Sequence, residues 1–281
     1  MTAIVRDATA ADVPALSQFL SRRFGSRASA FTRVFGYSWA AEKPDLGLLI
    51  EDEQRIRGFI GAMYSDRPLR GEVRRFCNIH DFVVDPEYRA LTLPMLGRLL
   101  APRDRIYTCF SASPTVIEIL KFFGFRIVDG SKVVFTPLSA PATRRRGVRL
   151  RAAADVPEAL DAAERRLLED HSSYRCGHFV LEAKTDRCYF VTIRRGRDVR
   201  AFADVLHASD PSLLAACAGH VHAAVTRRHL TPLLGLDRRF VRRAPPGAFV
   251  YDRTRPVAYR AADVEPQEVD ALYSELVPWY G

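Results

Sequence analysis

The first half of the chain alternates between short apolar runs and segments with helical spacing of apolar residues, which predicts a mixed α/β fold. A capping box formed by Thr9 and Asp12 begins the first helix, and the polar residues 52–55 separate two apolar runs as in a β-hairpin. The predicted strands are residues 2–6, 46–51, 57–64, 76–84, 106–110 and 133–136, and the other predicted helices are residues 93–100 and 114–123. The predicted order is therefore β, α, β, β, β, α, β, α, β.

A segment without periodicity divides the chain. Residues 137–147 are rich in proline, alanine, threonine and serine and contain three consecutive arginines, which indicates a linker. Directly after it, residues 148–157 (VRLRAAADVP) resemble residues 5–14 (VRDATAADVP). We therefore predict a first domain over residues 1–136 and a degenerate second copy over residues 148–281. A short similarity that is rich in alanine can also arise by chance.

Composition excludes several classes of protein. No apolar run approaches the roughly 20 residues of a membrane span, and the N-terminus lacks a signal peptide's basic and apolar regions, so we expect a cytoplasmic protein. No cysteine pair has C-x-x-C spacing, and His220 and His222 would point to different faces of a helix, so we expect no metal. The net charge of +9 suits an anionic partner such as CoA or an acidic carrier protein. Nucleic acid is not expected, because basic and aromatic residues do not interleave. The sequence leaves the oligomeric state open.

Two motifs in the first half resemble one enzyme family. The strand FCNIHDFVV over residues 76–84 continues through VDPEYR, residues 84–89, into a helix. This segment resembles the central signature of the Gcn5-related N-acetyltransferases. The segment YTCFSASP, residues 107–114, followed by a helix that ends in FGF, resembles the fifth strand and the next helix of the same family. The resemblance covers about residues 1–136 and implies two tandem acetyltransferase-like domains, the second degenerate, with a mixed sheet in an α/β fold.

The resemblance also implies a site for acetyl-CoA, another acyl-CoA or an acyl-carrier thioester. Pantetheine is expected to pair with the backbone of Phe82, Val83 and Val84, and the pyrophosphate to bind at Arg89, Ala90, Leu91, Thr92 and Leu93. A helix N-terminus attracts phosphate through its free N–H groups and its dipole. Thr92 and Pro94 occupy positions where the family has small residues. The alternative is therefore that these residues only begin a helix and that the loop no longer binds phosphate.

The strand over residues 76–84 carries the candidate base. Its period of two places Asn78, His80 and Phe82 on one face and Asp81 on the other. The resemblance makes His80 the candidate base and Asn78 a residue that orients substrate or water. A histidine titrates near neutral pH, but a buried core histidine is the equally open alternative.

Two serines are candidates for contacts with the donor. Ser111 or Ser113 could hydrogen-bond the leaving thiolate or the pantetheine amide, or serve only as helix caps. The resemblance implies a tyrosine that acts as the general acid for the leaving thiolate. Leu120 stands at that position, so the sequence offers no tyrosine for this role.

The sequence thus predicts an N-acyltransferase that uses a small-molecule amine as acceptor. The resemblance suggests an amino sugar of bacterial polysaccharide synthesis. The alternative is a non-catalytic acetyltransferase-like module that binds a ligand or a partner, which Thr92, Pro94 and Leu120 all favour.

Overall fold

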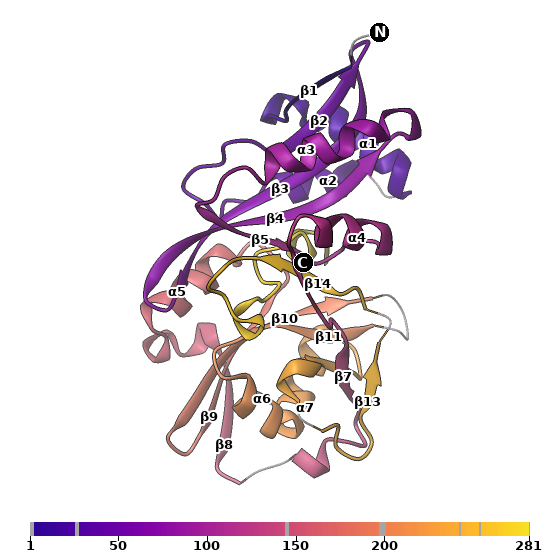
Figure 1. The fold of residues 1–281 in the computed structure, drawn as a ribbon. Coiled ribbons are helices and arrows are strands. Elements are labelled where there is room, and N and C mark those ends of the chain that lie inside the picture. Colours follow the sequence, from indigo (N-terminus) through magenta and orange to yellow (C-terminus); the bar gives the residue numbers. More distant parts are fainter. Residues whose placement is uncertain are drawn as a thin grey trace. The chain divides into compact units, whose positions relative to one another are not determined.

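The chain folds into two units, each built around its own seven-stranded sheet (Figure 1). The computed structural model describes residues 3–25, 28–143, 146–196, 201–241, 243–252 and 254–280. Unit 1 comprises Met1–Val128, Arg255–Val269 and Tyr273–Trp279, and unit 2 comprises Asp129–Thr254, Asp270–Leu272 and Tyr280–Gly281. Of the predicted linker, Arg144 and Arg145 lie outside the described residues. Within the described ranges, no helix is long and apolar enough to cross a membrane.

The sheet of unit 1 is antiparallel except for one parallel pair, β4 with β5. Its strands, in spatial order, are β1 (Ile4–Asp7), β2 (Gly47–Asp52), β3 (Arg55–Leu69), β4 (Glu72–Val84), β5 (Arg105–Cys109), β14 (Val257–Arg260) and β6 (Arg126–Val128). The predicted hairpin is present, because β2 and β3 pair up to Asp52 and Arg55. Glu53 and Gln54 form its two-residue turn with φ of 49° and 60°, as a type I′ turn requires.

Helices cover both faces of this sheet. α1 (Val13–Phe24) and α2 (Ala28–Phe35) bury Leu16, Leu20 and Phe31 in one core cluster. α3 (Thr92–Leu99) and α4 (Pro114–Phe122) bury side chains in the other cluster, namely Met95, Leu96, Leu99, Val116, Ile117 and Leu120. The short helix α8 (Leu276–Tyr280) lies near the end of the chain. Apolar residues at helical spacing therefore form these elements, as the pattern predicts.

The sheet of unit 2 repeats the strand order of unit 1. Its strands, in the corresponding order, are β8 (Val148–Ala152), β9 (Gly177–Ala183), β10 (Asp186–Arg195), β11 (Phe202–Ala208), β12 (Leu234–Asp237), β7 (Lys132–Phe135) and β13 (Phe249–Tyr251). In the described part of this sheet, only β11 and β12 pair in parallel. The helices are α5 (Ala162–Asp170), α6 (Pro211–Ala216) and α7 (Ala218–His229). Among the described residues, no α-helix separates β12 from β13, whereas α4 follows β5 in unit 1.

The two halves of the sequence exchange their last strands. β7 follows β6 in the chain but pairs with β12 and β13 of the second sheet. β14 follows β13 but pairs with β5 and β6 of the first sheet. The unit boundaries therefore differ from the expected ones, residues 1–136 and 148–281. The hydrophobic pattern shows which segments are strands, but partners more than a hundred residues apart are not encoded in it.

Residues 1–136 alone are expected not to fold, because without β14 the strands β5 and β6 lose the partner between them. A single polypeptide that joins residues 1–128 to residues 255–280 restores every strand of the first sheet and is expected to fold. Circular dichroism and thermal melting of both proteins test this. A cooperative transition for residues 1–136 alone would contradict it.

Candidate functional site

The parallel strands β4 and β5 part in the middle of β4. Their pairing runs from Arg75 with Arg105 to Asn78 with Thr108. β4 then continues through residues 79–84, while β5 ends at Cys109. Within the described residues, this last part of β4 has β3 on one side and no strand partner on the other. An extended backbone edge of this kind can pair with the amides of a ligand.

A β-bulge interrupts β4 just beyond this point. Gly61 pairs with His80 and Phe59 with Val83, so β4 contains one more residue than β3 in this interval. Asp81 takes up the extra residue with a φ of 47°, a left-handed conformation that non-glycine residues seldom adopt.

Because of the bulge, the side chains of residues 81–83 do not lie on the faces of β4 that the sequence predicts. Phe82 packs against the cluster beneath α3 and α4, away from His80, whereas Val83 packs against the cluster beneath α1 and α2. Asp81, expected on the opposite face, instead places its carboxylate against the imidazole of His80. A strict period of two fails here because one inserted residue moves every later side chain to the other face.

His80 is buried and has a defined orientation. Its Nδ1 lies 3.0 Å from Oδ2 of Asp81, and its ring packs against the rings of Phe35 and Phe59 at centroid distances of 6.3 and 6.4 Å. Burial alone would lower the pKa of His80, but the hydrogen bond and charge of Asp81, aided by the charge of Glu275, outweigh it and raise the pKa. The imidazole of His80 is thus a core side chain that is also paired with a carboxylate.

Asn78 lies at the point of divergence and connects two elements. Its Oδ1 accepts a hydrogen bond from Oγ1 of Thr108 at 3.2 Å, and its Nδ2 donates to Oε2 of Glu275 at 2.6 Å. Glu275 was missed by the sequence reasoning, because it is 197 positions from Asn78 and lies in an apolar terminal segment. No local signal marks it.

The segment between β5 and α4 holds the two candidate serines. The Oγ of Ser113 accepts a hydrogen bond from the backbone N–H of Val116 at 3.3 Å, so this serine caps α4. The backbone N–H groups of Ser111 and Ala112 bond the sulfur of Cys109, and burial of that thiol raises its pKa to about 12. Cys109 is therefore not a nucleophile at neutral pH.

The turn expected to bind pyrophosphate is a 3₁₀-helix, Pro86–Leu91, that leads directly into α3. Within it, the N–H of Thr92 donates to the carbonyl of Arg89, and Thr92 is buried. An ion pair of Asp85 with Arg23 fixes the start of the turn. Arg89 and Ala90 are exposed. Because Pro94 carries no N–H, fewer donors remain for phosphate than at an open glycine-rich loop.

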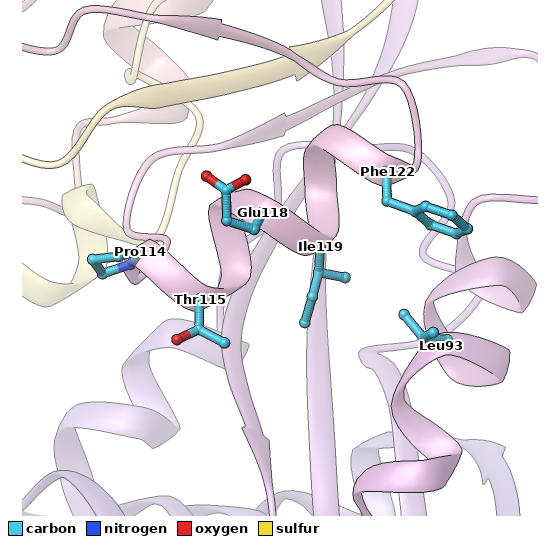
Figure 2. A pocket seen from close by; sticks show the side chains of 6 residues that line it. All are labelled: Leu93, Pro114, Thr115, Glu118, Ile119 and Phe122. Atoms are coloured by element: carbon cyan, nitrogen blue, oxygen red, sulfur yellow. The ribbon is translucent and has the colours of Figure 1, made fainter.

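An apolar cavity lies between α3 and α4. Its volume is about 650 Å³, and it is lined by Leu93, Pro114, Thr115, Glu118, Ile119 and Phe122. In Figure 2 the side chains of Ile119 and Phe122 point towards Leu93, and Glu118 points away from it. Lys121 forms an ion pair with Glu118 at 2.8 Å. The cavity thus borders the first turn of α3 on one side and one face of α4 on the other.

Comparison with known proteins identifies the architecture. No family model matches the sequence, and no curated protein matches it. A GCN5-related N-acetyltransferase from Anabaena variabilis is similar in structure, with a TM-score of 0.60, 12% identity and coverage of 92% of this chain and 72% of that one. A tandem GNAT protein from the clavulanic acid biosynthesis pathway has a TM-score of 0.53, 14% identity and coverage of 92% and 98%.

A third similar structure comes from a fungal multi-domain GH3 β-N-acetylglucosaminidase. Its GCN5-related glucosamine N-acetyltransferase region gives a TM-score of 0.57, 12% identity and coverage of 92% of this chain and 38% of that chain. The chain has the GCN5-related N-acetyltransferase fold. The mixed α/β class and the tandem acetyltransferase-like arrangement expected from the sequence are thereby confirmed.

Within this acetyltransferase fold, Gly61 gives the His80 ring its space. A Cβ atom at Gly61 would come within 2.6 to 2.8 Å of three imidazole atoms, whereas a Cβ at Gly97 would meet nothing closer than 3.8 Å. Gly61→Ala should therefore displace His80 and lower the free energy of unfolding by about 1–3 kcal/mol. Gly97→Ala, within helix α3, should raise it by about 0.5–1 kcal/mol.

Thermal melting and the NMR signals of His80 measure both effects. Equal stability of Gly61→Ala and the parent, with unchanged His80 signals, would show that the ring does not pack on Gly61.

Proposed function

We propose that this protein transfers an acyl group from an acyl-CoA or acyl-carrier thioester to a small-molecule amine. The observation that carries the proposal is the parting of β4 and β5 beside His80. It leaves the backbone edge of residues 79–84 without a strand partner on the side of β5, and it places a carboxylate-paired imidazole at the same position. The acetyltransferase fold of the chain supports this reaction class.

The donor would bind along β4 and end at α3 and α4. The backbone of Phe82, Val83 and Val84 offers N–H and C=O groups to pantetheine, and Arg89 offers a guanidinium to a phosphate. Leu93, 47% exposed, and Phe122, 77% exposed, would cover apolar parts of the donor in the cavity. Ser111 precedes α4 and stays the candidate partner of the leaving thiolate. Ser113 caps α4, so it can hydrogen-bond the pantetheine amide only if its bond to Val116 opens.

The reaction would proceed by direct attack of the amine. Because Nδ1 of His80 faces Asp81, Nε2 is the nitrogen that takes a proton from the acceptor ammonium. The freed lone pair forms the C–N bond with the thioester carbonyl carbon. Collapse of the tetrahedral intermediate breaks the C–S bond, and the thiolate takes up the second proton that leaves nitrogen. The products are an amide, a thiol and one proton on His80, which passes to solvent.

The acceptor that we favour is an amino sugar. The support is the likeness to the fungal glucosamine N-acetyltransferase region, together with the family resemblance of the sequence. A second candidate function is a non-catalytic module that binds a ligand through the same fold. The internal hydrogen bond of Thr92 and the apolar Leu120, which is buried in the core, favour that module.

Titration with acetyl-CoA separates the two candidates. The enzyme should bind acetyl-CoA with a Kd below about 1 mM, which corresponds to about −4 kcal/mol. Phe122→Ala should weaken this binding about tenfold because it removes apolar contact area from the cavity. Val73→Ala, at a residue that is 70% exposed near the start of β4, is the control and should change nothing. A Kd above 1 mM, with no binding of longer acyl-CoA, would support the module instead.

Activity should rise with pH, with a midpoint above the usual histidine pKa of about 6.5. The folded pKa of His80 is raised, so the neutral imidazole that accepts a proton predominates only above that range.

His80→Asn should lower kcat by about 10² to 10⁴ and leave acetyl-CoA binding intact. Asp81→Asn keeps the side-chain shape and tolerates the positive φ, and it should move the midpoint to lower pH.

The pH dependence of kcat/KM and an NMR titration of His80 measure these effects together. A midpoint that Asp81→Asn leaves in place, or full activity of His80→Asn, would show that His80 is only a core residue.

A further inference from the structure

Glu275 buries a carboxylate of which one oxygen has no partner. The residue is 7% exposed, and its Oε2 accepts the hydrogen bond of Asn78. Its Oε1 is buried and has no hydrogen-bond partner within the described part of the chain. An unpaired buried carboxylate oxygen costs free energy, since it has lost its water without gaining another donor. Such an oxygen calls for an explanation beyond packing.

The fold holds this carboxylate in one place. Tyr273 packs edge-on against Trp39 at a centroid distance of 5.4 Å, and Trp279 packs against Phe31 at 5.1 Å. These two aromatic contacts flank Glu275 and anchor the segment on both sides. Because Asn78 also holds Oε2, the carboxylate has a defined position and Oε1 is a preorganised acceptor.

The carboxylate stands where β4 and β5 part. Its partner Asn78 belongs to the last pair of the parallel strands, together with Thr108, which holds the amide oxygen of Asn78. His80 follows two residues later on the same strand and lies within the electrostatic reach of Glu275. Two acidic side chains, Asp81 and Glu275, thus accompany one imidazole at the start of the unpaired edge.

We propose that Oε1 of Glu275 receives the ammonium group of the acceptor and restricts the acceptor to primary amines that are cationic at neutral pH. A carboxylate only accepts hydrogen bonds, and an ammonium group supplies three donors and the opposite charge. An alcohol supplies one donor and no charge, so it leaves the carboxylate uncompensated. The inference rests on the proposed function for its assignment of this region to the acceptor.

The test measures binding to the full chain without any acyl donor. Cyclohexylamine and ethanolamine are compared by calorimetry with cyclohexanol and ethylene glycol, at about pH 8, where alkylamines are still cationic. At least one amine should bind about 30-fold or more tightly than its matched alcohol, as for a charge pair with a buried partner. Equal binding within both pairs, or no binding by either amine, would overturn the inference.

Two variants assign the effect to the side chain. Glu275→Gln keeps the shape and an acceptor for Asn78 but removes the charge, so it should abolish the preference for the amine. Glu268→Gln is the matched control, because this carboxylate lies in the same terminal region and pairs with Arg70 at an exposed site. It should leave the preference unchanged. If Glu275→Gln does not fold, Glu275→Asp is used instead. It keeps the charge but has a shorter side chain, so it should retain only part of the preference. An undiminished preference in Glu275→Asp would count against the proposal.

The failure of this inference differs from failure of the proposed function. Acylation of an amine by the parent, with an unchanged KM for the amine in Glu275→Gln, would overturn the role of Glu275 and leave the acyltransferase intact. Amine selection that depends on Glu275, in a protein that binds no acyl-CoA, would overturn the acyltransferase and leave the amine site.

Discussion

The pairing of β14 between β5 and β6 is the interaction on which unit 1 depends. It closes the sheet beside the candidate site, because β5 has β4 on one side and β14 on the other. It also brings the end of the chain into the unit, where Glu275 meets Asn78. The terminal segments of unit 1, more than 120 positions beyond β6, therefore supply both a structural partner, β14, and a charged group beside the candidate site, Glu275.

The bulge at Asp81 is the second feature that shapes the site. A left-handed aspartate costs about 1–3 kcal/mol relative to a relaxed strand, and the surrounding sheet must offset it. In return the bulge turns the carboxylate of Asp81 onto His80. Unit 2 has a bulge at the matching place, since Thr192 pairs with Val205 and Val191 with His207. The distortion therefore belongs to the fourth strand of each sheet.

Local pattern predicts the elements, and it fails where distant segments meet. The hairpin at residues 52–55, strand β4 and the start of α4 at Pro114 follow from periodicity and turn chemistry. His80 and Asn78 were singled out because the resemblance of their strand to a family signature makes them site residues and because a histidine titrates near neutral pH. The predicted orientation of Phe82 was wrong because nothing in the sequence FCNIHDFVV indicates a bulge. Glu275 and the exchange of β7 and β14 depend on contacts between segments far apart in the chain, which a single sequence does not contain.

The exchange of strands also sets the order in which the protein can be completed during synthesis. The first sheet has six of its seven strands once β6 has been made. The seventh, β14, does not begin until Val257, 129 residues later. At about 5–20 residues per second, the ribosome leaves β5 and β6 without their shared partner for roughly ten seconds. During that interval the first unit presents two open strand edges, and Glu275 has not yet been made. The newly made chain thus passes through an obligatory, aggregation-prone stage that a tandem protein with self-contained halves would avoid.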